Sequence, residues 1–269
     1  MIDCIKFLID KYLLKTQAWV ALMFALLCSF FSQNQLKSNN FLFAFCITLA
    51  AYNFIIYYTF WLRKKLLFPY FLIFFLTSSF SFYQILSHKD YNIYLLIVCF
   101  CIVILYRFIR NFSFLKNILI AICWSLAILA ISEFSFSKFF VLALFIFGFA
   151  IPFDWKNDYD KEDRELICYK TTHLGRAKNS TANQTVQHAP NKHLYLGATK
   201  TISLSSIFIS SILSWFLISD FRFNLIWSIS LSIAMLIIYF ANSLRSKFYF
   251  SFWLEGVSAL PFLLTIFFK

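Results

Sequence analysis

The sequence has little charge for its length. Only 13% of its 269 residues are charged, whereas 61% are apolar, and the mean hydropathy is +0.74. A soluble domain of this size has about a quarter of its residues charged, so too few charges are present to cover a soluble surface. Composition therefore excludes a soluble globular enzyme, a disordered protein and a nucleic-acid-binding domain. In this context the net charge of +12 is read as a sign of membrane topology.

Catalytic and metal-binding motifs of soluble enzymes are missing as well. The sequence contains no Walker, GxSxG or HExxH motif and no Cys-pair metal spacing. Its seven Cys do not indicate a disulfide scaffold, because five of them lie in apolar runs, where Cys acts as a small hydrophobe. Glu255 is the only ionisable residue inside such a run, whereas ion pathways usually show several. A transporter is therefore disfavoured.

Long apolar runs, rich in the 38 Phe residues, take up most of the chain. A bilayer core of about 30 Å needs roughly 20 apolar residues in a helix. Nine runs are candidates, and we expect an all-α polytopic membrane protein with one transmembrane domain over residues 1–269. The runs are 16–32, 41–62, 66–87, 91–106, 117–132, 139–153, 201–219, 223–244 and 248–268.

The positive charges predict the orientation of these nine runs. With the N-terminus inside and alternating crossings, 19 of the 24 Lys and Arg residues fall in the inside segments. Because Lys and Arg concentrate on the cytoplasmic side, this split predicts a cytoplasmic N-terminus and an outside C-terminus. We expect an integral protein of a bacterial cytoplasmic membrane, in contact with membrane lipid and not with nucleic acid.

One extramembrane segment is long, the loop 154–200 on the predicted cytoplasmic side. Its first twelve residues hold six of the twelve acids of the chain, among them Asp154 and Asp158. On a helix these two carboxylates would stand on one face, at i and i+4. Such a row of carboxylates can bind Mg²⁺ through one or two oxygens. The other coordination positions of the ion are then left to water and to the phosphates of a substrate. The alternative is a solvated loop of mixed charge.

Two basic pieces face the same side. One is Arg63, Lys64 and Lys65 after the second run, and the other extends from Arg107 through Arg110 to Lys116. Membrane anchoring explains both. The functional alternative is that they hold an anionic head group, which shares a cation with the acidic row.

With these features the whole chain resembles the UbiA superfamily of membrane prenyltransferases. Asp154 and Asp158 match the DxxxD spacing of its second Asp-rich motif, directly after the sixth run. Tyr106 and Arg110 match its Tyr with a basic residue four positions on. The resemblance implies nine helices around a central cavity. It further implies that a prenyl group passes from a Mg²⁺-bound prenyl diphosphate to an aromatic or other lipid-soluble acceptor, at the cytoplasmic membrane face.

The resemblance also implies roles for individual residues. The metal ligands and catalytic acids would be Asp154 and Asp158, with Asn53 as a further catalytic residue. The residues that would bind substrate are Tyr106, Arg110, Lys170, Arg63, Lys64 and Glu255. A carboxylate facing lipid is costly, so Glu255 is expected to face the bundle interior, with polar partners in the seventh run or near Arg110.

The first Asp-rich motif departs from the family pattern. In place of NxxxDxxxD the chain has Asn53, Tyr57 and Trp61, so both carboxylates are missing. One Mg²⁺ site is therefore expected rather than two. The alternative is a non-catalytic relative that binds an isoprenoid or quinone-like lipid, or that acts as a scaffold.

Overall fold

The structure, a computed structural model, describes residues 17–32, 38–61, 68–87, 91–109, 112–152, 190–241 and 249–268. Over these ranges the chain is helical and contains no strand. Nine helical segments are present in the described part, one for each predicted run. They are α2 (Ala18–Phe31), α3 (Ser38–Trp61), α4 (Phe68–Ser87), α5 (Ile93–Ile109), α6 (Ser113–Ile131), the helix Phe136–Pro152, α8 (Pro190–Leu217), α9 (Phe221–Phe240) and the segment 249–267.

Five of these helices are long and apolar enough to cross a membrane. Their spanning stretches are Asn39–Tyr58, Phe68–Ser87, Phe114–Ile131, Gly197–Leu217 and Phe221–Phe240. The other four apolar helices are shorter. The all-α prediction is confirmed for the described residues, and the set of apolar helices is compatible with a multi-pass integral membrane protein.

Two elements differ from their predicted form. Helix α8 begins at Pro190, well before the predicted start at residue 201. Proline has no N–H to leave unpaired and suits the first turn of a helix. The segment 249–267 is not one regular helix but a π-helix, η2 (Tyr249–Leu254), a 3₁₀ turn, η3 (Val257–Ala259), and α10 (Leu260–Phe267). Pro261 stands in the first turn of α10, so the ladder of hydrogen bonds is interrupted before it.

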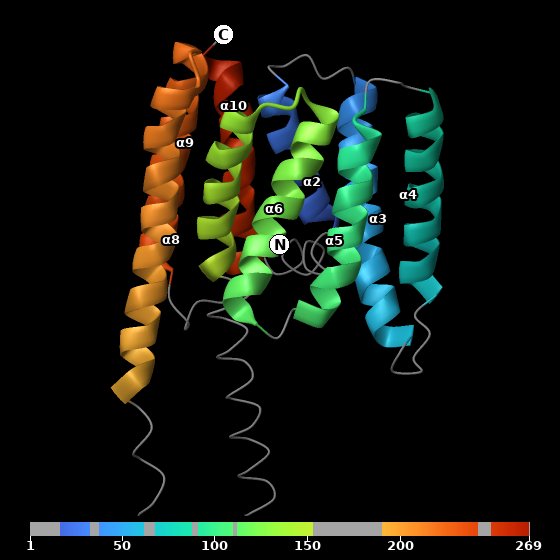
Figure 1. The fold of residues 1–269 in the computed structure, drawn as a ribbon, viewed down its shortest axis with the longest axis horizontal. Coiled ribbons are helices and arrows are strands. Elements are labelled where there is room, and N and C mark those ends of the chain that lie inside the picture. The colour runs from blue at the N-terminus through green and yellow to red at the C-terminus, as the bar shows by residue number, and fades with distance from the viewer. Residues whose placement is uncertain are drawn as a thin grey trace, which may run out of the picture.

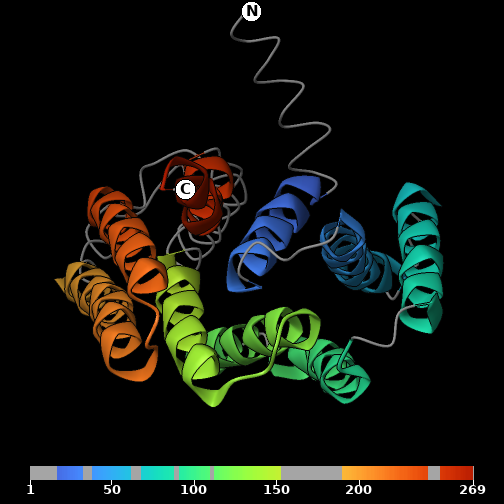
Figure 2. The ribbon, with the colours of Figure 1, turned by 90° about the horizontal axis from the view of Figure 1, so that it is seen from above.

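Successive helices run in opposite directions and pack with their neighbours (Figure 1). Helix α3 packs on α2 and α4, α5 on α6, α8 on α9, and α10 on α2 and α9. Seen from above, the helices form an irregular ring (Figure 2). The helices α3, α4 and α5 lie on one side of it, and α8, α9 and α10 lie on the other.

A cluster of buried rings lies between α2, the helix Phe136–Pro152 and α9. Trp227 is fully buried there, with ring centroids 5.4 Å from Phe31 and 5.1 Å from Phe145. Hydrogen bonds tie α8 to the helix Phe136–Pro152, since Ser203 Oγ donates to Gly148 O at 2.5 Å and Ser210 Oγ donates to Val141 O at 2.6 Å. Two backbones therefore meet closely on this side of the bundle.

Candidate functional site

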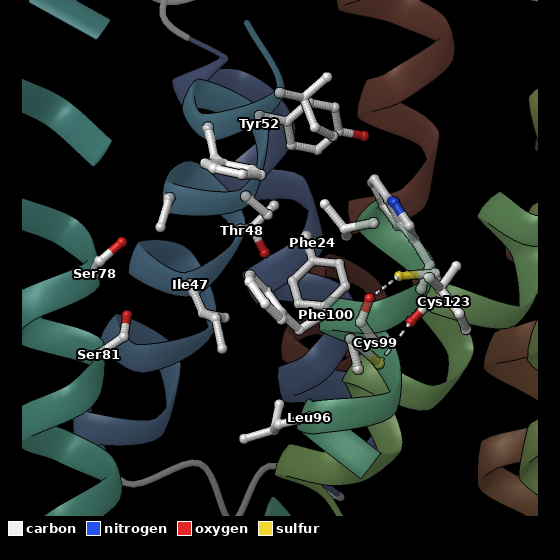
Figure 3. A pocket seen from close by; sticks show the side chains of 18 of the residues that line it. Phe24, Ile47, Thr48, Tyr52, Ser78, Ser81, Leu96, Cys99, Phe100 and Cys123 are labelled. Carbon is white, nitrogen blue, oxygen red and sulfur yellow. Dashed lines mark hydrogen bonds between the residues drawn. The ribbon is translucent and has the colours of Figure 1, made fainter. Parts of the chain in front are cut away.

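A cavity of about 500 Å³ lies among α2, α3, α4, α5 and α6 (Figure 3). Its walls are mostly apolar and carry many rings. The aromatic side chains that line it are Phe24, Tyr52, Phe54, Phe74, Phe82, Phe100, Tyr106 and Trp124. Pockets of this size and character bind small, largely apolar molecules.

Several polar groups of the wall are satisfied by their own helix. Thr48 Oγ1 donates to Ala44 O at 2.8 Å, and Ser81 Oγ donates to Thr77 O at 2.8 Å. These hydroxyls need no hydrogen-bond partner from a ligand. Because each already donates to a backbone carbonyl, an apolar ligand can cover it without leaving the hydroxyl hydrogen unpaired. The cavity therefore suits a hydrocarbon chain or ring with few polar atoms.

The phenol of Tyr52 provides a polar point at one end. Figure 3 shows Tyr52 at the opposite end of the cavity from Leu96. Glu255 and Tyr106 lie within electrostatic range of Tyr52, whose ring stands edge-on to Trp124 at 6.4 Å. Together these side chains could receive the single polar group of an otherwise apolar ligand.

Two predicted site residues of the bundle wall are placed differently. Tyr106 lines the cavity, as its predicted role in substrate binding requires. Asn53 is fully buried next to the lining residues Tyr52 and Phe54 but does not itself line the cavity. Its Nδ2 donates to Leu49 O of the preceding turn at 2.8 Å. Asn53 thus lies in α3, beside the cavity wall.

Glu255 lies between η2 and η3, in the irregular part of the segment 249–267. Its Oε2 is buried and has no hydrogen-bond partner among the described residues. The carboxylate is close enough to Tyr52 for an electrostatic interaction across the bundle. This interior placement agrees with the expectation from sequence, although the polar neighbour is a tyrosine of α3 rather than a residue of α8.

The remaining predicted site residues lie outside the described residues. They are Asp154, Asp158, Arg110, Lys170, Arg63 and Lys64. The described helix ends next to them in sequence lie at one end of the bundle, where α3, α5 and the helix Phe136–Pro152 end and α4, α6 and α8 begin (Figure 1). The predicted active-site rim would therefore have to form at that end.

No metal centre is evident in the part of the chain that the structure describes. It contains no group of three or more His, Cys, Asp or Glu side chains that could hold an ion. Both predicted Mg²⁺ ligands, Asp154 and Asp158, fall outside it. The described residues thus supply the apolar part of the candidate site and none of its predicted metal ligands.

Sequence reasoning missed the residues that now define the cavity. Tyr52, Cys99, Cys123 and Trp124 lie in apolar runs, where they look like ordinary lipid-facing or core residues. The one available signal was the position of Tyr52, directly before Asn53. Cys99 and Cys123 carry no signal in the sequence, because only the pairing of α5 with α6 brings them together.

Comparison of the chain with models of protein families, with curated proteins and with solved structures gives no match.

Proposed function

We propose that this protein is a UbiA-like membrane prenyltransferase, in which all nine helical segments cross the bilayer. It transfers a prenyl group from a prenyl diphosphate to a lipid-soluble acceptor at the cytoplasmic face. The observation that carries the proposal is the ring-lined apolar cavity of about 500 Å³ among α2 to α6. A prenyl chain has no polar atoms, so apolar walls leave none of its groups unpaired, and its transfer from water into such walls gains about 0.8 kcal/mol for each CH₂ group.

The position of the polar end of the cavity supports this arrangement. Tyr106 lies near the end of α5, and Arg110 follows that helix in sequence. A chain lying in the cavity would then point its head group toward the rim where the basic and acidic segments begin. Tyr52 lines the cavity and would receive the polar group of the acceptor, with Glu255 within electrostatic range of its phenol.

The proposed chemistry assigns Asp154 and Asp158 to one Mg²⁺ ion. A bound Mg²⁺ would stabilise the negative charge that develops on the diphosphate as it leaves. Arg110, Lys170, Arg63 and Lys64 would hold the diphosphate, with Arg suited to bidentate contacts. Asn53 would fix the geometry of α3 beside the cavity, where its side chain is buried.

The test uses the full chain in lipid nanodiscs with Mg²⁺, radiolabelled prenyl diphosphates and a membrane lipid extract. We expect release of diphosphate and a prenylated lipid product, both abolished in Asp154→Asn and Asp158→Asn. Asp220→Asn is the matched control, because Asp220 caps the N-terminus of α9 and Asn caps equally well. Turnover that survives the first two changes would contradict the assigned site.

A second candidate is a non-catalytic isoprenoid- or quinone-binding protein, and one contact favours it. Tyr57 stands where the first motif would have its first carboxylate, and its ring packs on Phe71 of α4 with centroids 5.2 Å apart. An aromatic contact there holds two helices together and offers no ligand to a cation. Binding of the prenyl diphosphate or of a quinone without any turnover would support this candidate against the first.

A further inference from the structure

Cys99 of α5 and Cys123 of α6 face each other in the wall of the cavity. Cys99 Sγ donates to Cys123 O at 3.4 Å, and Cys123 Sγ donates to Cys99 O at 3.7 Å. The two thiols also interact with each other. Figure 3 shows the two contacts side by side between the helices. Because each sulfur reaches the backbone of the other residue, the cysteines stand at the same level of the α5–α6 interface.

We propose that Cys99 and Cys123 form a redox-active dithiol, which a lipid-soluble quinone in the cavity oxidises to a disulfide. A disulfide needs two Cα atoms roughly 4.4–6.8 Å apart, a spacing met only where two backbones approach closely. The reciprocal contacts between thiols and carbonyls indicate such an approach. Both cysteines line the cavity, so an occupant of the cavity reaches the sulfurs directly.

The surroundings favour a quinone over other partners of a thiol pair. A ring-lined apolar cavity accepts a flat apolar ring more readily than a charged, water-soluble oxidant. A metal ion is disfavoured, since no third His, Cys, Asp or Glu joins the pair among the described residues. The phenol of Tyr52 is available in the same cavity to donate a hydrogen bond to a carbonyl oxygen of a quinone.

The reaction balances without a further reagent. The S–H bonds of Cys99 and Cys123 break and one S–S bond forms. Two electrons and two protons pass to the quinone, whose two carbonyl oxygens become the hydroxyls of a hydroquinone. A thiolate is the attacking species in such chemistry, so one thiol must lose its proton first. The disulfide would join α5 to α6 inside the bundle.

This inference rests on the second candidate function in one respect, because a quinone must enter the cavity. It uses neither Mg²⁺ nor a diphosphate. The experiment below contains neither of them, so its outcome does not depend on whether a prenyl diphosphate binds or reacts.

The experiment uses the full chain with Cys4 and Cys168 replaced by serine, reduced and placed in lipid nanodiscs. The oxidant is tetramethyl-1,4-benzoquinone, whose fully substituted ring offers no free position for thiol addition. Three quantities are measured: the thiols that react with a maleimide, the peptide linkage by mass spectrometry, and the hydroquinone formed.

We expect the protein to lose two of its five remaining thiols and to form one hydroquinone, with a linkage between Cys99 and Cys123. Cys99→Ser and Cys123→Ser should abolish both changes while the fold persists, since a serine hydroxyl keeps the hydrogen bond to the facing carbonyl. Cys101→Ser is the matched control and should behave as the parent protein. Its side chain is exposed, and two residues turn a helix by about 200° away from Cys99.

Three results would overturn the proposal. One is no loss of thiols with the quinone. Another is equal loss in Cys99→Ser or Cys123→Ser. The third is a Cys99–Cys123 disulfide that forms with the small oxidant diamide but not with the quinone, because the cavity would then not deliver a quinone to the pair.

Discussion

Aromatic side chains fill space on one side of the bundle, around α9, and border a cavity on the other side, around α4. Around α9, rings fill space: eight residues of this helix are buried, and the ring of Trp227 is stacked with Phe30 and edge-on to Phe31. In α4 only Ser81 and Gln84 are buried, and rings such as Phe54, Phe74 and Phe100 border a cavity. An aromatic-rich composition therefore does not fix whether a membrane bundle is packed or hollow.

Small side chains allow the close helix contact on the packed side. Gly148, Ser203 and Ser210 let α8 and the helix Phe136–Pro152 approach closely enough for side chain to backbone hydrogen bonds. Contacts of this kind between small residues drive helix association in membranes. Helices α3 and α4 also pack on each other, but here large rings meet between them, as in the contact of Tyr57 with Phe71. The packed side gives stability, and the hollow side offers a binding space.

The largest effect is expected from truncating the two interior tryptophans. Trp227→Ala should lower the free energy of unfolding by about 3–5 kcal/mol, because it removes a fully buried ring from the packed side. Trp124→Ala should cost less, on the order of 2 kcal/mol, because Trp124 already borders empty space. Equilibrium unfolding in detergent micelles measures both. Equal losses of unfolding free energy in the two variants would contradict the distinction between a packed side and a hollow side of the bundle.

A smaller loss is expected from crowding the closest helix contact. A Cβ on Gly148 would lie 2.6 Å from Ser203 O, so Gly148→Leu should destabilise the protein by about 1–3 kcal/mol. Gly197→Leu in α8 is the matched control, since a Cβ there meets nothing within 4 Å. The same unfolding measurement should leave that control near the parent. An unchanged free energy of unfolding in Gly148→Leu would show that α8 and the helix Phe136–Pro152 do not pack this closely.

The smallest effect concerns the interhelical hydrogen bonds of Ser210. Ser210→Ala removes the bond to Val141 O and should cost about 0.6–1.7 kcal/mol, the range for such bonds in membranes. Ser230→Ala is the control, because Ser230 is equally buried but donates only to Ile226 O of its own helix, at 2.8 Å. The difference between the two variants measures both interhelical contacts of Ser210, because its Oγ also accepts a hydrogen bond from Trp227 Nε1 at 3.4 Å. A difference of zero would contradict its contribution to packing.

The amount that could be predicted from sequence differs between fold and site. All nine apolar runs contain a helix, because the length and continuity of apolar residues are local properties that the chain displays directly. The 3₁₀ turn before Pro261 and the early start of α8 at Pro190 were not predicted. The interior placement of Glu255 followed from the cost of exposing a carboxylate to lipid.

The cavity itself could not be predicted. Its walls come from five helices, and whether their rings meet or leave space depends on the distances between helices, which no local pattern encodes. The resemblance gave Tyr106 a place in the site, and Tyr106 does line the cavity. It gave no hint of Tyr52, Trp124 or the pair Cys99 and Cys123. The predicted metal ligands Asp154 and Asp158 lie outside the described residues and stay predictions.

The central claim is that an isoprenoid chain lies in the cavity among α2 to α6. The most direct measurement is photo-crosslinking with a prenyl diphosphate that carries a diazirine at the end of its chain, followed by mapping of the labelled peptides. The account predicts labels on cavity-lining residues such as Leu96, Phe100 and Ile47, which excess unlabelled prenyl diphosphate removes. Labels spread over the exposed faces of α8 and α9, insensitive to that competition, would contradict it.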